Sequence, residues 1–123
     1  MSKILLVDDD LYIRELYLEI LTDAGYEVEM AVDGKEGFEK IVEGGYDLIL
    51  LDVMMPYLDG IGILRKLEDE RPKKSNGPII LLTNLAYDPV IKEATQRGAA
   101  ACLYKAEMNP DEFLKTISEY IKK

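Results

Sequence analysis

The chain of 123 residues contains no histidine and only one cysteine, Cys102. The lack of histidine excludes Ser-His-Asp and Cys-His catalysis, histidine-ligated zinc and a role as a phosphohistidine carrier. A single cysteine cannot form a disulfide within the chain, which predicts a reducing, cytoplasmic setting. We interpret Cys102 as a small buried hydrophobe rather than as a redox sensor.

Long apolar runs and strong basic clusters are also missing. No apolar run approaches the roughly 18 residues of a membrane span, and three aspartates by residue 10 leave no room for the apolar region of a signal peptide. The 24 acidic and 15 basic residues give a formal net charge of -9, which disfavours nucleic acid and anionic lipid surfaces. We therefore expect no direct nucleic-acid partner and no membrane partner.

Five strand-like apolar segments alternate with five helix-like segments. This alternation predicts an α/β domain with a parallel sheet, and the length fits one domain over residues 1–123. The second segment alternates apolar and acidic residues, which is typical of an edge strand, whereas the first, third and fourth are nearly continuous apolar runs. The predicted strands are Ile4–Val7, Tyr26–Met30, Asp47–Leu51, Pro78–Leu82 and Ala101–Tyr104.

The predicted helices are bounded by capping residues. Gly25 ends the first helix, and Asp88 and Asn109, each followed by proline, are the expected N-caps of the fourth and fifth. The second begins near Asp33-Gly34, and the third follows Gly60.

Polar residues stand at the carboxyl ends of four predicted strands, which is where ligands bind in an open α/β sheet. Neighbouring carboxylates repel one another, so such a cluster predicts a bound cation. Oxygen ligands without histidine or cysteine favour Mg²⁺. The residues are Asp8, Asp9 and Asp10 after the first strand, Asp52 after the third, Thr83 after the fourth and Lys105 after the fifth.

This set of groups suits phosphoryl transfer, in which an aspartate can be the nucleophile. Mg²⁺ and Lys105 would offset the charge of the phosphoryl oxygens, and the Thr83 hydroxyl could hydrogen-bond one of them. Each residue alone has a simpler interpretation. Asp8–Asp10 could only cap the first helix, Asp52 could cap a strand end, and a lone lysine is usually a surface charge.

Four motifs in this order resemble the receiver domain of bacterial two-component response regulators, over nearly the whole chain. They are Leu6–Asp10, Asp52–Gly60, Leu82-Thr83, and Gly98-Ala99 followed by Lys105. The resemblance implies a flavodoxin-like (βα)5 three-layer sandwich whose parallel five-stranded sheet has the order 2-1-3-4-5. It implies that Asp52 is the phosphoacceptor, contacted by Thr83 and Lys105, and that Mg²⁺ is held by Asp8, Asp9, Asp52 and the backbone carbonyl of Met54.

The resemblance also implies partners. A histidine kinase or phosphotransfer protein would supply the phosphoryl group, and a downstream target or effector domain would read it. A homodimer through the fourth and fifth helices is a further expectation. The chain would be a signalling domain that catalyses only its own phosphorylation and slow dephosphorylation. Because it stops after the fifth helix, we expect a stand-alone regulator or a receiver from a larger protein.

Four features depart from the commonest family form. One is the polar fourth helix, which together with Tyr104 makes an unusual version of the family's output face. Asn84 replaces a small residue after the threonine, and with Met54 nearby it predicts that attacking water is hindered and self-dephosphorylation is slow. Cys102 stands where relatives usually have a switching aromatic residue, although Tyr104 lies on the same strand face. Ala106 replaces a common proline, and a cis bond before it would cost roughly 2.5–4 kcal/mol.

Three other functions remain open on the sequence. The first is a phosphorylation-independent interaction module on the same fold, which the departures favour and the complete acidic set opposes. The second is a phosphatase of the haloacid dehalogenase type, because Asp8 and Asp10 match its nucleophile spacing, but Tyr12 does not fit its pattern. The third is a flavin carrier, which the acidic first strand-helix turn disfavours.

Overall fold

The computed structural model describes residues 2–55, 58–83, 88–105 and 109–121, and in them strand and helix alternate five times as predicted. The strands are β1 (Lys3–Val7), β2 (Glu27–Ala31), β3 (Leu48–Asp52), β4 (Ile79–Thr83) and β5 (Ala101–Tyr104). The helices are α1 (Leu11–Asp23), α2 (Gly34–Glu43), α3 (Gly60–Asp69), α4 (Asp88–Gln96) and α5 (Pro110–Ile121).

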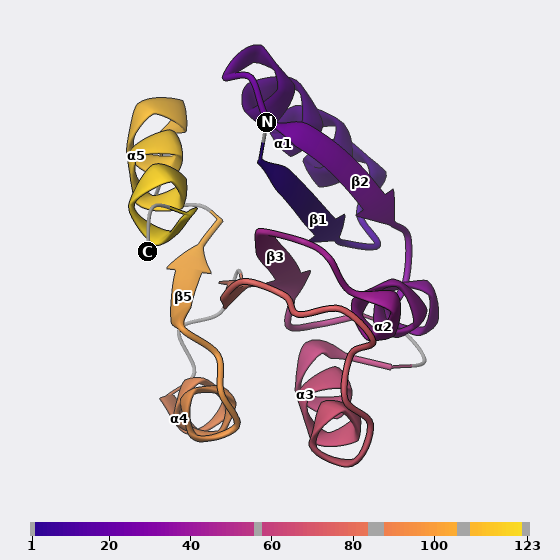
Figure 1. Ribbon diagram of the computed structural model, residues 1–123. Coiled ribbons are helices and arrows are strands. Elements are labelled where there is room, and N and C mark those ends of the chain that lie inside the picture. The colour runs from indigo at the N-terminus through magenta and orange to yellow at the C-terminus, as the bar shows by residue number, and fades with distance from the viewer. Residues whose placement is uncertain (1, 56–57, 84–87, 106–108, 122–123) are drawn as a thin grey trace.

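All strand pairs are parallel, and their order is β2-β1-β3-β4-β5. Figure 1 labels β2, β1, β3 and β5 of this sheet. This confirms the flavodoxin-like order and places β2 at an edge. Strands β2, β3 and β4 lie one residue further along the chain than predicted, so Asp52 and Thr83 are the last residues of their strands. Their positions are therefore determined by the sheet itself and not by a flexible loop.

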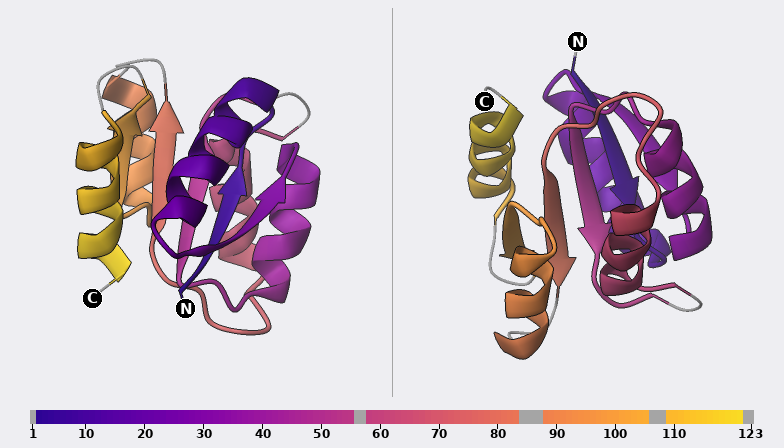
Figure 2. Two further views of the ribbon diagram at one scale, coloured as in Figure 1. Left: turned by 90° about the horizontal axis from the view of Figure 1, so that it is seen from above. Right: turned by 60° about the horizontal axis from the view of Figure 1, so that its bottom comes forward.

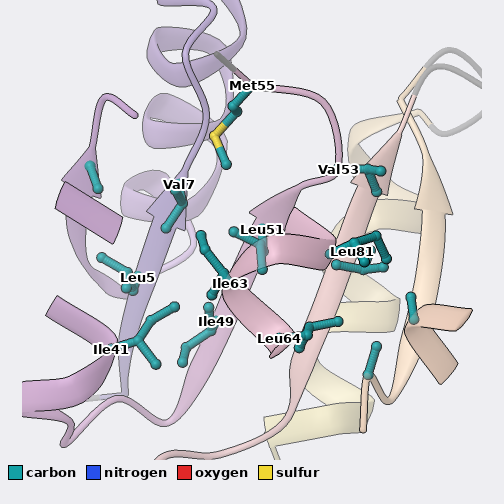
Figure 3. Packing of buried hydrophobic residues seen from close by; sticks show 14 of the residues in the cluster. Leu5, Val7, Ile41, Ile49, Leu51, Val53, Met55, Ile63, Leu64 and Leu81 are labelled. Carbon is teal, nitrogen blue, oxygen red and sulfur yellow. The ribbon is translucent and has the colours of Figure 1, made fainter. Parts of the chain in front are cut away.

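The sheet lies between two layers of helices (Figure 2). On one face, α1 and α5 pack against alternate strand residues, including Ile4, Leu50 and Leu82. On the other face, α2, α3 and α4 cover a second cluster that includes Leu5, Leu51 and Leu81 (Figure 3). Because successive strand residues point to opposite faces, the continuous apolar runs supply both clusters at once.

Several predicted helix boundaries have the capping contacts that explain them. The side chains of Asp10, Asp33 and Asp59 each accept a hydrogen bond from the backbone N–H three residues further on, which identifies them as N-caps. Gly25 adopts φ 94° after α1, as expected of a left-handed helix end. The fourth helix, α4, begins at Asp88 in the described ranges, where the sequence predicted its start, and the capping role of the Asp88 side chain stays a prediction. None of the helices in the described ranges is long and apolar enough to cross a bilayer.

Candidate functional site

The structure brings together the acidic, hydroxyl and ammonium side chains at the carboxyl edge of the sheet. Asp8 follows β1 and is fully buried, while Asp52 ends β3 and is 6% exposed. Thr83 ends β4 and is also buried. Lys105 follows β5, and its backbone N–H donates to the carbonyl of Thr83 at 2.9 Å. Four separate strand ends therefore position one set of functional groups.

Lys105 forms the central contact of this set. Its Nζ donates to Asp8 Oδ2 at 2.6 Å and lies 3.4 Å from Asp52 Oδ1. The side chain of Lys105 is only 5% exposed, so little water screens these contacts. Burial would lower the pKa of Lys105, but its hydrogen bond to Asp8 and the charge of Asp52 outweigh burial and raise it. Lys105 therefore stays cationic between the two carboxylates.

The carboxylates fit a hard cation. Asp8, Asp9 and Asp52 each offer an oxygen, and these three oxygens lie within 4.8 Å of one another. Asp9 is exposed, which leaves the cluster open to solvent on one side. One ammonium group does not neutralise three carboxylates. An ion that prefers oxygen ligands and retains water, as Mg²⁺ does, would balance the remaining charge.

Asp52 shows the effect of this excess negative charge. Burial first, and then the charge of Asp8, raise the pKa of Asp52 to about 7, although Lys105 and the Met54 N–H oppose the rise. The N–H of Met54 donates to Asp52 Oδ1 at 3.3 Å. A cation beside the carboxylate would favour its charged form. The carboxyl group at this position is therefore unusually responsive to a bound cation.

Two residues near β1 have supporting roles that the sequence did not reveal. Arg14 on α1 donates through Nη1 to the backbone carbonyl of Asp8 at 2.8 Å. The N–H of Asp10 donates to Asp8 Oδ1 at 3.0 Å, while the Asp10 side chain caps α1. Asp10 therefore orients Asp8 through its backbone and uses its own carboxylate elsewhere. No local pattern marks Arg14, because its acceptor is a backbone carbonyl six residues earlier.

Gly60 allows α3 to begin directly beside the phosphoacceptor candidate. Its N–H donates to the carbonyl of Val53 at 3.0 Å. A Cβ on Gly60 would lie only 2.8 Å from the backbone oxygen of Asp52. The sequence marked Gly60 as a turn and helix start, and the structure adds the close approach to the end of β3.

The structure describes only some of the positions that depart from the commonest form of the family. Asn84 and Ala106, with the bond between Lys105 and Ala106, lie outside the described residues. Cys102 is half-buried, and Tyr104 is the register partner of Thr83 across β4 and β5. Met54 is 60% exposed in the loop after β3.

Comparison with known proteins gives a consistent result. The model of the response regulator receiver domain matches residues 4–118. A transcriptional regulatory protein, the CpxR homolog of Haemophilus influenzae, is 39% identical over the whole chain. The chain spans 52% of that relative's length.

Solved structures agree. A CheY-like receiver domain protein from Methanospirillum hungatei has a TM-score of 0.87 and 33% identity, covering 99% of this chain and 94% of the other. The receiver domain of sensor histidine kinase PA1611 from Pseudomonas aeruginosa, with magnesium in its active site cleft, has a TM-score of 0.85 and 27% identity, covering 99% and 98%. With the acidic cluster at the expected sheet edge, this chain belongs to the response regulator receiver domain family.

Proposed function

We propose that Asp52 accepts a phosphoryl group from a histidine kinase or phosphotransfer protein and thereby switches an interaction surface of this domain. The observation that carries the proposal is the buried Asp52 carboxylate, which lies within reach of Lys105 and shares a three-oxygen cluster with Asp8 and Asp9. A domain with no phosphoryl group to bind gains no stability from placing two carboxylates beside each other in its interior. As a receiver domain, the chain is a signalling domain.

In the proposed reaction, an oxygen of ionised Asp52 attacks phosphorus. A new P–O bond forms while the bond from phosphorus to the donor's histidine nitrogen breaks, and the electron pair returns to that nitrogen. Mg²⁺, when bound, neutralises oxygens of the transferring group. Asp8, Asp9, Asp52 and the backbone carbonyl of Met54 are the residues that would hold it.

Lys105 and Thr83 bind the phosphoryl oxygens in this proposal. Lys105 lies near both Asp8 and Asp52, so it can shift toward a new anion with little movement. Thr83 is buried at the end of the neighbouring strand, where its hydroxyl could report the new charge. Binding by groups held on strand ends costs little reorganisation.

The surface around the site fits a protein donor. The large hydrophobic side chains exposed in the described ranges lie near this edge of the sheet, on α1 and in the loops after β2 and β3. The net charge of -9 favours a partner surface with basic residues around an apolar centre. The exposed residues are Leu11, Tyr12, Leu16, Val32 and Met54.

Incubation with Mg²⁺ and a small acyl phosphate tests the proposal. Intact-mass measurement should show the addition of one phosphoryl group, lost in Asp52→Asn and retained in Asp10→Asn. The second variant is a matched control because Asn caps a helix as well as Asp does. Lack of uptake by the unaltered chain would support a phosphorylation-independent module instead. Repeated turnover of unrelated phosphate esters would support a phosphatase.

Two further expectations belong with this proposal. The chain acts as one domain over residues 1–123, and phosphorylation favours pairing through α4 and α5. Light scattering before and after phosphoryl uptake measures the second expectation directly. If light scattering showed the same monomeric molar mass before and after phosphoryl uptake, the switched surface would serve a different partner.

A further inference from the structure

Helix α4 contributes little apolar surface to the core. Among residues 91–96, whose side chains are described, only Ala94 is buried, at 1% exposure. The neighbouring helices α2 and α3 bury larger side chains against the same face, including Ile41, Ile63 and Leu64. A buried methyl group stabilises far less than a buried leucine or isoleucine. In its described part, α4 is therefore held only weakly by apolar packing.

A chain of four alternating charges joins α4 to α3. Glu93 Oε2 accepts from Arg65 twice, at 2.6 Å from Nη2 and 3.2 Å from Nε. It also accepts from Arg97 Nε at 2.9 Å, and Arg97 Nη1 donates to Glu68 Oε1 at 2.6 Å. Arg65 and Glu68 belong to α3, while Glu93 lies on α4 and Arg97 directly follows it. We name these four residues the α3–α4 charge network.

This network is stronger than a single surface ion pair. An isolated exposed pair contributes little, but several charges with short, paired contacts contribute more. The side chains of Glu93 and Arg97 are only 33% and 28% exposed. The hydrogen bonds from Arg65 and Arg97 lower the pKa of Glu93, as expected for a carboxylate stabilised in its charged form. Glu93 is therefore the main link between the two helices.

The end of α4 next to the network is also fixed by its backbone. Gly98 adopts φ 107°, and the N–H of Ala99 donates to the carbonyl of Ala94 at 3.0 Å. Such a left-handed ending terminates the helix firmly. If the network were lost, this carboxyl-terminal turn would stay in place through its backbone hydrogen bonds, and the rest of α4 could move about it.

Cys102 packs against the same core cluster as this helix. It belongs to the edge strand β5 and packs against the core cluster that contains Ala94 and Ala99. Cys102 is half-buried, and this partial burial raises the pKa of its thiol and so suppresses the reactive thiolate. The chain has no other cysteine. An increase in the reactivity of this half-buried thiol therefore reports further uncovering of its face of β5.

We propose that the α3–α4 charge network is a latch that holds α4 over β5, and that breaking it lets α4 open locally while the remaining fold stays intact. Opening exposes the face of β5 that carries Cys102 and packs against the cluster containing Ala94. The latch operates without any phosphoryl group, so it is independent of the function proposed above. It makes exposure of this face sensitive to ionic strength.

Labelling of Cys102 with an aromatic disulfide tests the latch in the full chain, without phosphoryl donor. We expect Glu93→Gln to label roughly three- to tenfold faster than the unaltered chain, which is the change an ion network of this size would give. Glu43→Gln is the matched control, because the same substitution removes the exposed ion pair between Glu43, the last residue of α2, and Lys73, which lies between α3 and β4. Its labelling rate should equal that of the unaltered chain.

Salt gives an independent measurement. Raising NaCl from about 0.05 M to about 0.5 M screens exposed charges. It should therefore speed labelling of the unaltered chain and of Glu43→Gln more than that of Glu93→Gln, which retains only the Arg97–Glu68 contact of the network. Equal labelling of Glu93→Gln and the unaltered chain would overturn the proposal. So would labelling rates that follow global unfolding by circular dichroism in every variant. If Glu93→Gln does not fold, the same labelling experiment is done with Arg65→Gln. This substitution on α3 removes the Arg65–Glu93 contacts and leaves the sequence of α4 unaltered.

Discussion

Asp52 is a buried carboxyl group whose pKa lies well above that of an exposed carboxylate. Its pKa is raised to about 7, whereas an unfolded chain holds aspartate near about 4. Between these values the folded chain binds more protons than the unfolded chain, so stability falls as the pH rises. Below about pH 4 both states hold the proton, and Asp52 then no longer disfavours folding.

Asp52→Asn removes this titration. With Mg²⁺ removed by a chelator, we expect the variant to be more stable than the unaltered chain at pH 8 by roughly 1–3 kcal/mol. The difference should shrink as the pH is lowered toward 4. Urea denaturation at several pH values measures it, with Asp10→Asn as the control. A stability difference that does not change with pH would contradict the raised pKa.

Met54 bears on the lifetime of the proposed aspartyl phosphate. It is exposed two residues beyond Asp52, where a large apolar side chain can hinder an attacking water. We expect loss of the phosphoryl group to take minutes or longer, and Met54→Ala to speed it a few-fold. The decay of the phosphorylated mass after removal of the donor measures this. Val32→Ala, which shortens another exposed side chain near this edge, should leave the rate unchanged.

At the scale of elements, the junction between β3 and α3 is the tightest part of the site. Gly60→Ala would place a Cβ 2.8 Å from the Asp52 carbonyl oxygen and 3.1 Å from Val53 Cα. Backbone atoms cannot yield as a flexible side chain can, so we expect about 1–3 kcal/mol of destabilisation. The rate of phosphoryl uptake should fall as well, because Asp52 moves. Urea denaturation and mass measurement report the two effects separately.

Gly25→Ala is the contrasting substitution at the end of α1. A Cβ there meets nothing within 4 Å, but the backbone has φ 94°. The cost is therefore conformational, about 1–2 kcal/mol, and lies far from the acidic cluster. We expect lower stability with an unchanged rate of phosphoryl uptake. If phosphoryl uptake were slower than in the unaltered chain, the end of α1 would be coupled to the acidic cluster.

At the scale of the whole molecule, an excess of negative charge gathers at one end of the sheet. Mg²⁺ should therefore stabilise the fold by binding the native state alone, by about 1.4 kcal/mol at ten times its dissociation constant. This corresponds to a rise of roughly 5 °C in Tm. NaCl of equal ionic strength controls for general screening of the net charge. Calorimetry of Asp52→Asn should show a smaller rise, and an equal rise would place the metal elsewhere.

Much of the fold could be predicted because its signals are local. Aspartates at positions 10, 33 and 59 mark helix starts, and continuous apolar runs mark strands covered on both faces. Strand ends are harder to predict, because β3 and β4 include Asp52 and Thr83, which a hydropathy pattern assigns to the loops. The backbone pairing of Asp52 with Leu82 extends the ladder despite the charge.

The candidate site could be predicted as a set of residues but not as a geometry. Order along the chain and the parallel sheet place aspartates, threonine and lysine at one edge. Nothing local shows that Lys105 Nζ lies closer to Asp8 than to Asp52, or that Asp9 stays exposed. Those distances depend on the twist and register of strands separated by many residues.

Composition and periodicity are properties of the chain alone. The alternation of elements, the lack of histidine and the members of the acidic cluster therefore follow from the order of the residues. The pairing of the charges, in contrast, depends on the folded chain. Lys105 and Asp8 are 97 positions apart, and Arg65 and Glu93 are 28 positions apart. Contacts at such separations arise from the packing of whole elements, so no local pattern encodes which partner each charge selects.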